Sequence, residues 1–316
     1  MEFWKRTGVI ISCVCLSDLV SGLSFEHEIT TEHFLEARGS LPKRDVRRDP
    51  LFLLIGLMST LEATERRETI RHTWGSIARH PPSVDYKFFL EAEDEQASKE
   101  EQSAFNDLTY VDTQSDYRTS VIKTYKIMEY SYIHLDCRFI LKADDDTYIN
   151  VIPLVQELQQ MCRHQDCRHA KLYIGQMNQA GAIRALHMPD GQPSQYYNAP
   201  YHARTGLEYY PHYMVGGGYI VTQDIAAGLV AVNSFVGLKV FHLEDANFGF
   251  WLSPLNVHYV NHPQFSVLGQ PSTVREVYAN GSSVLRVPGP LFLQPLRALQ
   301  GLNDCFAKQS FPESMA

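Results

Sequence analysis

An uninterrupted apolar run at residues 51–59, Leu-Phe-Leu-Leu-Ile-Gly-Leu-Met-Ser, constrains the fold more than any other feature of this sequence. A strand with one face in water alternates apolar and polar residues, whereas a strand covered on both faces has no need to alternate. Both faces are covered when helices pack on either side of a parallel sheet. The run therefore predicts a central strand of an α/β domain, beginning at Leu51.

Helical and extended patterns alternate as far as residue 142. Apolar residues at helical spacing, such as Val121, Tyr125 and Met128, predict a helix at 120–135. The Glu-, Asp- and Gln-rich segment 91–106 is expected to be a solvated helix or loop. The remaining elements expected here are a helix at 64–73 and strands at 85–90, 108–111 and 138–142. This alternation predicts a doubly wound α/β layer.

The second half of the chain alternates less regularly. Its expected elements are a strand near 172–175, an irregular Pro-, Gly- and Tyr-rich region at 181–211, a further segment at 214–222, and helices at 224–233 and 244–251. No internal repeat is visible, and the tail from Pro263 onward, rich in Pro, Gly and Ser, has no assignable pattern. The doubly wound pattern is therefore confined to the first half.

Length and charge narrow the class of protein. The 316 residues could hold one large α/β domain or two small ones. The chain has 28 Lys and Arg against 36 Asp and Glu, a net charge of −8, and its basic residues cluster no further than pairs such as Arg47-Arg48. A protein that binds a nucleic-acid duplex needs a dense basic face. We therefore expect no nucleic-acid partner.

The first 24 residues form a separate unit. Lys5 and Arg6 precede an apolar run of signal-peptide length, shorter than the roughly 18 apolar residues of a confident spanning helix. A cleaved signal, a short uncleaved anchor and a buried start to the fold are the alternatives, and the first two send the chain into the secretory pathway. Residues 25–49 are typical of a stem or linker, so the folded domain is expected at 50–316.

Cysteine usage agrees with an oxidising compartment, because the four cysteines outside the first 24 residues are an even number that disulfides could pair. Cys162 and Cys167 bracket a short polar loop that a disulfide could close. Zinc is the weaker alternative, since further ligands at metal spacing are missing. A Cys137–Cys305 pair is a second expectation that spacing alone does not establish. Asn280 begins the only N-x-Ser/Thr sequon and predicts an N-glycan.

Three consecutive aspartates, Asp144-Asp145-Asp146, follow directly on the strand expected at 138–142. In open α/β sheets, ligands bind where the strands end. Neighbouring carboxylates repel one another unless a cation is present, and hard oxygen ligands suit Mg²⁺ or Mn²⁺. Such an ion would neutralise a diphosphate leaving group. The alternative is an acidic N-terminus for a helix expected near Ile152.

Three further segments accompany the aspartates, and the four occur in this order: ERRETIRHTWG at 65–75, ADDDTY at 143–148, YPHYMVGGGYIVT at 210–222 and HLEDANFGFWL at 242–252. Together they resemble glycosyltransferase family 31, the β1,3-galactosyl- and β1,3-N-acetylglucosaminyltransferases. The likeness covers roughly residues 51–265 and is greatest to the glycosaminoglycan-linker β1,3-galactosyltransferases and their plant relatives.

The resemblance implies a GT-A fold, with a Rossmann-like nucleotide-binding half and a mixed-sheet acceptor half. It implies that Asp146 is a direct Mn²⁺ ligand and that Asp144 lies near the ribose or the metal. The residues expected around the nucleotide and donor sugar are Arg67, Arg71, Trp74, Lys123, Asp144, Asp145, Gly217 and Gly218. A solvated helix face for Lys123 and a tight turn or β-bulge at the glycines are the alternatives.

Glu244-Asp245 matches the Glu-Asp pair of the family, whose aspartate is the expected catalytic base. Inversion requires one carboxylate to take the proton of the acceptor hydroxyl while that oxygen attacks the anomeric carbon. We therefore expect Asp245 to be catalytic, and Glu244 and Trp251 to lie on the acceptor side. The alternative is that Asp245 is an ordinary helix N-cap.

The sequence departs from the family in one respect. Members usually provide a metal-binding His after the Glu-Asp pair, but no His follows His262 here. His262 or His258 is the candidate substitute ligand. The departure implies altered metal coordination, weaker metal binding or impaired catalysis.

The leading interpretation is an inverting, Mn²⁺-dependent β1,3-galactosyltransferase that uses UDP-galactose and a glycan acceptor. It would be a Golgi membrane protein with a lumenal catalytic domain, or a lumenal or secreted protein if the signal is cleaved. One alternative is the same chemistry with UDP-N-acetylglucosamine, and another is a non-catalytic lumenal glycan-binding subunit on the same fold. The intact carboxylates favour an enzyme, because a scaffold has no need of them.

Overall fold

The computed structural model describes residues 41–44, 50–79, 83–113, 119–163, 167–178, 198–207, 209–241, 243–265 and 293–295. Among these residues no helix combines the length and the apolar character that crossing a membrane requires. The expected leader at 1–24, Cys305 and the sequon at Asn280 lie outside the described residues.

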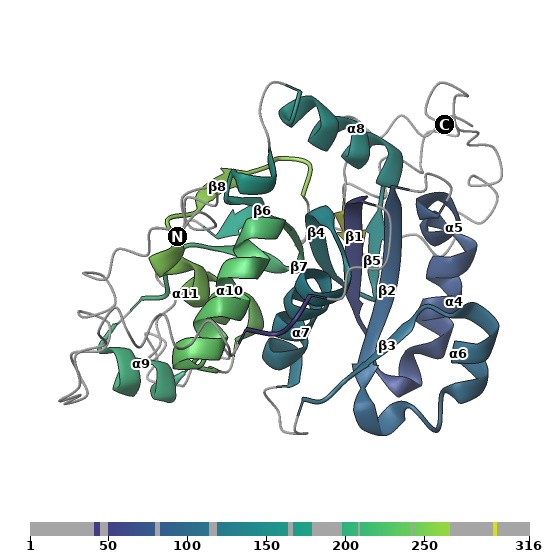
Figure 1. Ribbon diagram of the computed structural model, residues 1–316, viewed down its shortest axis with the longest axis horizontal. Coiled ribbons are helices and arrows are strands. Elements are labelled where there is room, and N and C mark those ends of the chain that lie inside the picture. The colour runs from purple at the N-terminus through teal and green to yellow at the C-terminus, as the bar shows by residue number, and fades with distance from the viewer. Residues whose placement is uncertain are drawn as a thin grey trace, which may run out of the picture.

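Seven described strands form one mixed sheet (Figure 1), in the order β3-β2-β1-β4-β7-β6-β8. They are β1 (Leu51–Met58), β2 (Val84–Glu91), β3 (Leu108–Val111), β4 (Cys137–Asp144), β6 (Leu172–Asn178), β7 (Tyr213–Thr222) and β8 (His258–Asn261). The first four in chain order are mutually parallel, whereas β7 is antiparallel to β4 and β6, and β8 is parallel to β6. The expected α/β fold, with a Rossmann-like half and a mixed half, is confirmed.

Every strand of this sheet except β7 runs in the same direction, so the strands end at one edge, where β7 begins. We call this the carboxyl edge. A separate two-stranded ladder pairs β5 (Thr147–Ile149), which follows the three aspartates, with β9 (Leu293–Pro295).

Helices cover both faces of the sheet. They are α4 (Thr64–His72), α5 (Trp74–Ala78), α6 (Lys99–Phe105), α7 (Thr119–His134), α8 (Val151–Met161), α9 (Ala199–Thr205), α10 (Gln223–Val236) and α11 (Glu244–Leu252). Alternate side chains of β1 enter different cores: Leu53 and Ile55 pack with α4, α5 and α8, while Leu54 packs with α7, α10 and α11. Burial on both faces explains why the sequence of this strand does not alternate.

The same alternation in β4 decides where its polar residues point. Leu141 and Ala143 belong to the core beneath α4 and α5, and Ile140 belongs to the core beneath α7 and α11. Because successive side chains of a strand face opposite ways, Lys142 and Asp144 point to the α7 and α11 side.

Close packing of α11 against the start of β7 brings Glu244 and Asp245, at the N-terminal end of α11, to the carboxyl edge. A Cβ at Gly249 would lie 2.5 Å from the Cβ of Tyr213 and 2.7 Å from the carbonyl oxygen of His212. Any side chain at this position would push the helix off the strand. Glycine at this position therefore allows α11 to pack closely against β7.

The elements expected in the first half are confirmed to within two residues at each end, with α6 inside the segment expected to be helix or loop. The second half differs more. Helix α9 lies within the region expected to be irregular, and β8 was not expected. The parallel order also stops at β4, because β7 is antiparallel to it. An apolar pattern shows that a strand is buried but not which way it runs.

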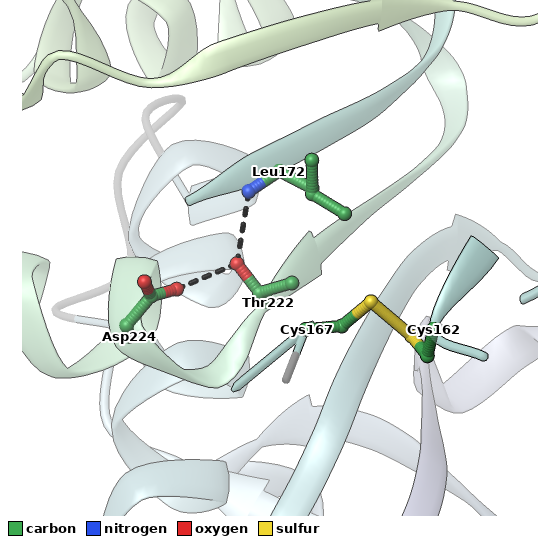
Figure 2. The surroundings of a disulfide bond; sticks show 5 residues. All are labelled: Cys162, Cys167, Leu172, Thr222 and Asp224. Carbon is green, nitrogen blue, oxygen red and sulfur yellow. Dashed lines mark hydrogen bonds between the residues drawn. A yellow bond between two sulfur atoms is a disulfide. The ribbon is translucent and has the colours of Figure 1, made fainter. Parts of the chain in front are cut away.

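The expected disulfide between Cys162 and Cys167 is present. Figure 2 shows it near two hydrogen bonds of Thr222 at the end of β7. Thr222 Oγ1 accepts from Leu172 N at the start of β6 and donates to Asp224 in α10. The bridge ties the end of α8 to the chain entering β6. Cys137 is a buried free thiol that donates to Gln223.

Residues of the expected stem also contact the domain. Arg44 donates from Nε to the carbonyl oxygen of Tyr132 at 3.1 Å and from Nη2 to that of Leu135 at 3.3 Å. Both carbonyls lie at the C-terminal end of α7, where a cation is favourable. Arg44, a residue of the expected stem, therefore contacts the domain that the sequence predicts at 50–316.

Candidate active site

The carboxyl edge brings together acidic residues that are far apart in the sequence. Asp144 is the last residue of β4, while Glu244 and Asp245 open α11. Between them lies β7, whose Gly216 donates its backbone N–H to Asp245 Oδ2 at 3.1 Å. The structure thus places the three-aspartate motif and the Glu-Asp pair in one site.

Lys142 joins these two acidic segments. Its side chain is 1% exposed, and Nζ donates to Asp144 Oδ1 at 3.1 Å, to Glu244 Oε2 at 3.0 Å and to the Gly216 carbonyl oxygen at 2.6 Å. Burial alone would lower the pKa of this amine, but the carboxylates of Asp144 and Glu244 hold the pKa above its ordinary value. Lys142 is therefore a fixed positive charge between β4, β7 and α11.

Glu244 is held by side chains on three elements. Its Oε1 accepts hydrogen bonds from Thr124 at 2.6 Å and from the Tyr219 hydroxyl at 2.7 Å, and its Oε2 accepts from Lys142. A carboxylate with three such donors is fixed in place.

Asp245 has a different environment. Its carboxylate accepts backbone hydrogen bonds from Gly216 and, at 2.8 Å, from Ala246. Burial, and then the charge of Glu244, raise the pKa of Asp245 to about 6. Leu243 is the N-cap of α11, so Asp245 lies inside the first turn and the N-cap alternative is wrong in position.

The three consecutive aspartates have unequal access to solvent. Asp145 is buried and accepts hydrogen bonds from Ser59 and Arg66, both at 2.8 Å. The side chains of Asp144 and Asp146 are 39% and 43% exposed. The outer two are therefore the ones that a ligand can reach, and Asp145 anchors the turn to α4.

The site carries an excess of negative charge. Its carboxylates are Asp144, Asp145, Asp146, Glu244 and Asp245, and the cations paired with them are Lys142 and Arg66. Five negative and two positive charges leave a formal charge of −3. Among the described residues, no group of three His, Cys, Asp or Glu side chains is arranged to hold a metal. Two accessible carboxylates fit an Mg²⁺ or Mn²⁺ ion that takes its other ligands from a diphosphate.

His262 lies apart from the aspartates. It follows β8, and two strands separate β8 from β4. At about 4.8 Å per strand, three spacings place it roughly 14 Å away. Its Nε2 is 3.9 Å from Glu157, and burial lowers the pKa of the ring. The printed ionic contact of His262 is thus with Glu157, and its role as a metal ligand stays a prediction without support from the described contacts. His258, at the first position of β8, is also separated from β4 by two strands.

Arg67 and Arg71 belong to a buried ion-pair network. Arg67 donates from Nε and Nη2 to the two oxygens of Glu101, each at 2.7 Å. Arg71 donates to Asp107 at 2.9 and 2.8 Å and to Glu101 at 2.6 Å. Both guanidinium groups face internal carboxylates rather than an open pocket. Arg67 also donates to the carbonyl oxygen of Thr60, so it fixes the loop that follows β1.

Trp74 and Lys123 are buried as well. Trp74 is 0% exposed and packs edge-on against Tyr86, so its ring has no open face for a base in this structure. Lys123 is not on a solvated helix face, because Nζ donates to the Ser59 carbonyl oxygen at 2.9 Å and pairs with Glu91 at 2.9 Å. It ties α7 to the ends of β1 and β2. Their expected contacts with a nucleotide stay predictions.

The glycines of β7 form an irregular stretch beside the aspartates. Gly175 pairs with Tyr219 and Met177 with Met214, so β6 advances by two residues while β7 advances by five. The β-bulge expected as the alternative is therefore present. The glycines in it also contact the aspartate segment. The carbonyl oxygen of Gly217 accepts from Thr147 at 2.9 Å, and Gly218 pairs with Ala143 of β4.

Trp251 lies elsewhere on α11. It is 4% exposed, and its Nε1 donates to the carbonyl oxygen of Lys239 at 2.6 Å. Together with Tyr125 of α7 and Asn233 of α10 it lines a cavity of about 260 Å³. Glu244 and Asp245 do not line this cavity, so the expected place of Trp251 on the acceptor side finds no direct support.

Sequence reasoning missed Lys142 and Arg66 as residues of the site. A signal for Lys142 was present, because a lysine within an otherwise apolar strand must find a partner when both faces are buried. Arg66 adjoins the recognised Arg67 but points the other way, to Asp145 and, at 3.9 Å, to Asp146.

Parallel strands that end in accessible carboxylates, joined to a mixed half that supplies a second acidic pair, define a domain of the nucleotide-sugar transferase class. The family model described as galactosyltransferase matches residues 65–263, which is more than half of the chain. The chain therefore belongs to the galactosyltransferase family.

Curated relatives agree. The chain is 27% identical over 226 residues to mouse beta-1,3-galactosyltransferase 6, an alignment that covers 69% of this chain and 65% of that protein. It is 25% identical over 247 residues to lactosylceramide 1,3-N-acetyl-beta-D-glucosaminyltransferase A of Danio rerio, covering 73% and 62%. The alignments span less than two thirds of either relative. A solved structure of the galactosyltransferase LgtC with donor and acceptor sugar analogues matches with a TM-score of 0.39 and 12% identity, over 83% of this chain and 98% of that one.

Proposed function

We propose that the chain transfers galactose from UDP-galactose to the terminal sugar of a glycan acceptor, with inversion and formation of a β1,3 linkage. One observation carries this proposal: Asp245, a half-buried aspartate whose pKa is raised to about 6 by desolvation, shares the carboxyl edge with the accessible carboxylates of Asp144 and Asp146. A base and a candidate metal site at one edge are what an inverting transfer from a nucleotide sugar requires.

In the proposed reaction, the acceptor oxygen forms a bond with the anomeric carbon as the bond from that carbon to the diphosphate oxygen breaks. Asp245 takes the proton of the acceptor hydroxyl, and UDP leaves with the electron pair. Burial keeps this carboxylate basic enough to accept a proton near neutral pH. Glu244 stays bound by Lys142, Thr124 and Tyr219, so it shapes the site without exchanging the proton.

Asp144 and Asp146 would hold Mn²⁺ together with oxygens of the diphosphate, and the ion would supply charge neutralisation for the leaving group. Asp145 keeps the turn in place through Ser59 and Arg66. The net charge of −3 in the site favours a divalent cation over a bare anionic substrate.

A Golgi location with the domain in the lumen is part of the proposal. The Cys162–Cys167 disulfide supports it, because disulfides persist in the secretory pathway. The leading segment supports it through its basic start and short apolar run.

UDP-N-acetylglucosamine is the second candidate donor. The relative from Danio rerio, whose name specifies N-acetylglucosaminyl transfer, favours it at nearly the same identity as the mouse galactosyltransferase.

The test is UDP release by the secreted protein, measured with each donor, a panel of glycan acceptors, and Mn²⁺ or EDTA. We expect acceptor-stimulated, Mn²⁺-dependent release of UDP from UDP-galactose. Release from UDP-N-acetylglucosamine alone would select the second donor. Glycan binding with no UDP release under any condition would indicate the non-catalytic subunit.

A further inference from the structure

Two sets of hydrogen bonds connect Lys142 with the surroundings of Asp245, the proposed base. It donates to Glu244, the neighbour of Asp245 in α11, at 3.0 Å. It also donates to the carbonyl oxygen of Gly216 at 2.6 Å, and the N–H of the same glycine donates to Asp245 at 3.1 Å. A Cβ at Gly216 would lie 3.4 Å from both carboxyl side chains, so the backbone passes close against the pair.

We propose that Lys142 is a positioning residue, which clamps Glu244 and Gly216 and so leaves Asp245 as the carboxylate of this pair that can accept a proton from the acceptor. The expected effect of Lys142 on turnover rests on the proposed transfer reaction. The placement of Glu244 by the buried ammonium of Lys142 follows from their hydrogen bond alone.

Electrostatics gives the reason for such a clamp. Glu244 and Asp245 are adjacent in the first turn of a helix, and two like charges at close range disfavour each other's ionised form. The positive charge of Lys142, which is hydrogen-bonded to Glu244, offsets this repulsion. Among the described residues, the other titratable groups that interact with Asp245 are hydroxyls, those of Tyr173 on β6, Tyr210 ahead of β7 and Tyr219 on β7. Within this described part of the chain, Lys142 is the cation that counters Glu244.

The test replaces the ammonium by an uncharged chain of similar length, Lys142→Met. Lys87→Met is the matched control, because Lys87 is also a buried strand lysine but lies on β2, two strands from β4, and donates to the carbonyl oxygen of Asn106. Carbon NMR of aspartate-labelled protein follows the titration of Asp245, assigned by its loss in Asp245→Asn. The titration needs no turnover.

In Lys142→Met we expect the Asp245 midpoint to rise from about 6 by about one pH unit. The turnover number should fall by about 10- to 100-fold. Lys87→Met should leave the midpoint and the turnover number unchanged. A midpoint in Lys142→Met equal to that of the wild type would overturn the proposal.

A second variant covers the case in which Lys142→Met does not fold, since it leaves Glu244 buried without its cation. In Lys142→Met/Glu244→Gln both charges are gone, so the protein should fold and Asp245 should titrate near 6 again. Its turnover should still be reduced by at least about tenfold, because Gly216 has lost its clamp. Full turnover in this double variant would overturn the positioning role. Failure of the wild type to release UDP would contradict the proposed function instead, and the Asp245 titration would still decide the role of Lys142.

Discussion

Two groups of charged side chains in this molecule differ in how their charges are balanced. In the arginine network (Arg67, Arg71, Glu101 and Asp107), paired hydrogen bonds join buried guanidinium groups to carboxylates. At the carboxyl edge, by contrast, five carboxylates share Lys142 and Arg66. The first group has its charge matched inside the protein, and the second retains an excess of negative charge.

The difference separates a structural role from a chemical one. A matched, buried ion pair has little left to offer a ligand, and removing one partner leaves an uncompensated charge that costs stability. An excess of carboxylate charge costs stability in the native state but is available to a cation and a proton. Changes in the arginine network should therefore affect folding, and changes at the carboxyl edge should affect activity.

Asp146→Asn should have the largest effect at the edge. We expect loss of detectable transfer and weaker Mn²⁺-dependent UDP binding, because an amide lacks the charge that a divalent cation requires. UDP calorimetry with and without Mn²⁺ measures this. Glu100→Gln, an exposed carboxylate on α6, is the control. Normal Mn²⁺-dependent UDP binding by Asp146→Asn would remove Asp146 from the metal site.

The acid limb of the pH–rate profile should report Asp245. The folded pKa of about 6 lies above the ordinary value of 3.8, and the ionised form is the base, so activity is present above pH 6 and lost below it. The turnover number should fall about tenfold per pH unit below 6, as one proton is bound. Turnover at saturating donor and Mn²⁺ is the measurement. A limb near pH 4 would show that the base has an ordinary pKa.

Asp107→Asn tests the arginine network. Asp107 is fully buried and pairs with Arg71 and, at 3.3 Å, with Arg79. Its neutralisation leaves Arg71 without its main partner, so the free energy of unfolding should fall by about 3–5 kcal/mol. Denaturant unfolding measures the change, and Glu100→Gln should stay within about 0.5 kcal/mol of the wild type. At a temperature where Asp107→Asn is folded, turnover should be near normal, and a selective loss of turnover would assign this network to the site.

His262→Ala should have the smallest effect. Because His262 contacts Glu157 rather than the aspartates, the apparent Mn²⁺ affinity of the enzyme should not change. Turnover as a function of Mn²⁺ concentration checks this. A loss of about tenfold or more in Mn²⁺ affinity would instead identify His262 as a ligand.

Sequence reasoning succeeded where one pattern determines one structure. The apolar run at 51–59 and the helical spacing at 120–135 gave β1 and α7, and the family motifs placed Asp144 and Asp245 in one site. It failed where the outcome depends on the packing of distant segments. The direction of β7 and the orientation of Trp74 are of this kind. The motif that contains Arg67 also does not determine whether this arginine pairs with Glu101 or with a phosphate.

The central claim is that Asp245 is the base of a transfer reaction and Glu244 its fixed neighbour. The turnover number of Asp245→Asn, measured with UDP-galactose and the acceptor found in the panel, tests it most directly. We predict a fall of about 10²- to 10⁴-fold, with unchanged UDP affinity. The melting temperature at pH 7 should not fall. The raised pKa means that the ionised side chain costs stability above pH 6, and asparagine removes that cost. Near-normal turnover by Asp245→Asn, with the substitution confirmed by mass, would contradict the account and move the role of base to Glu244.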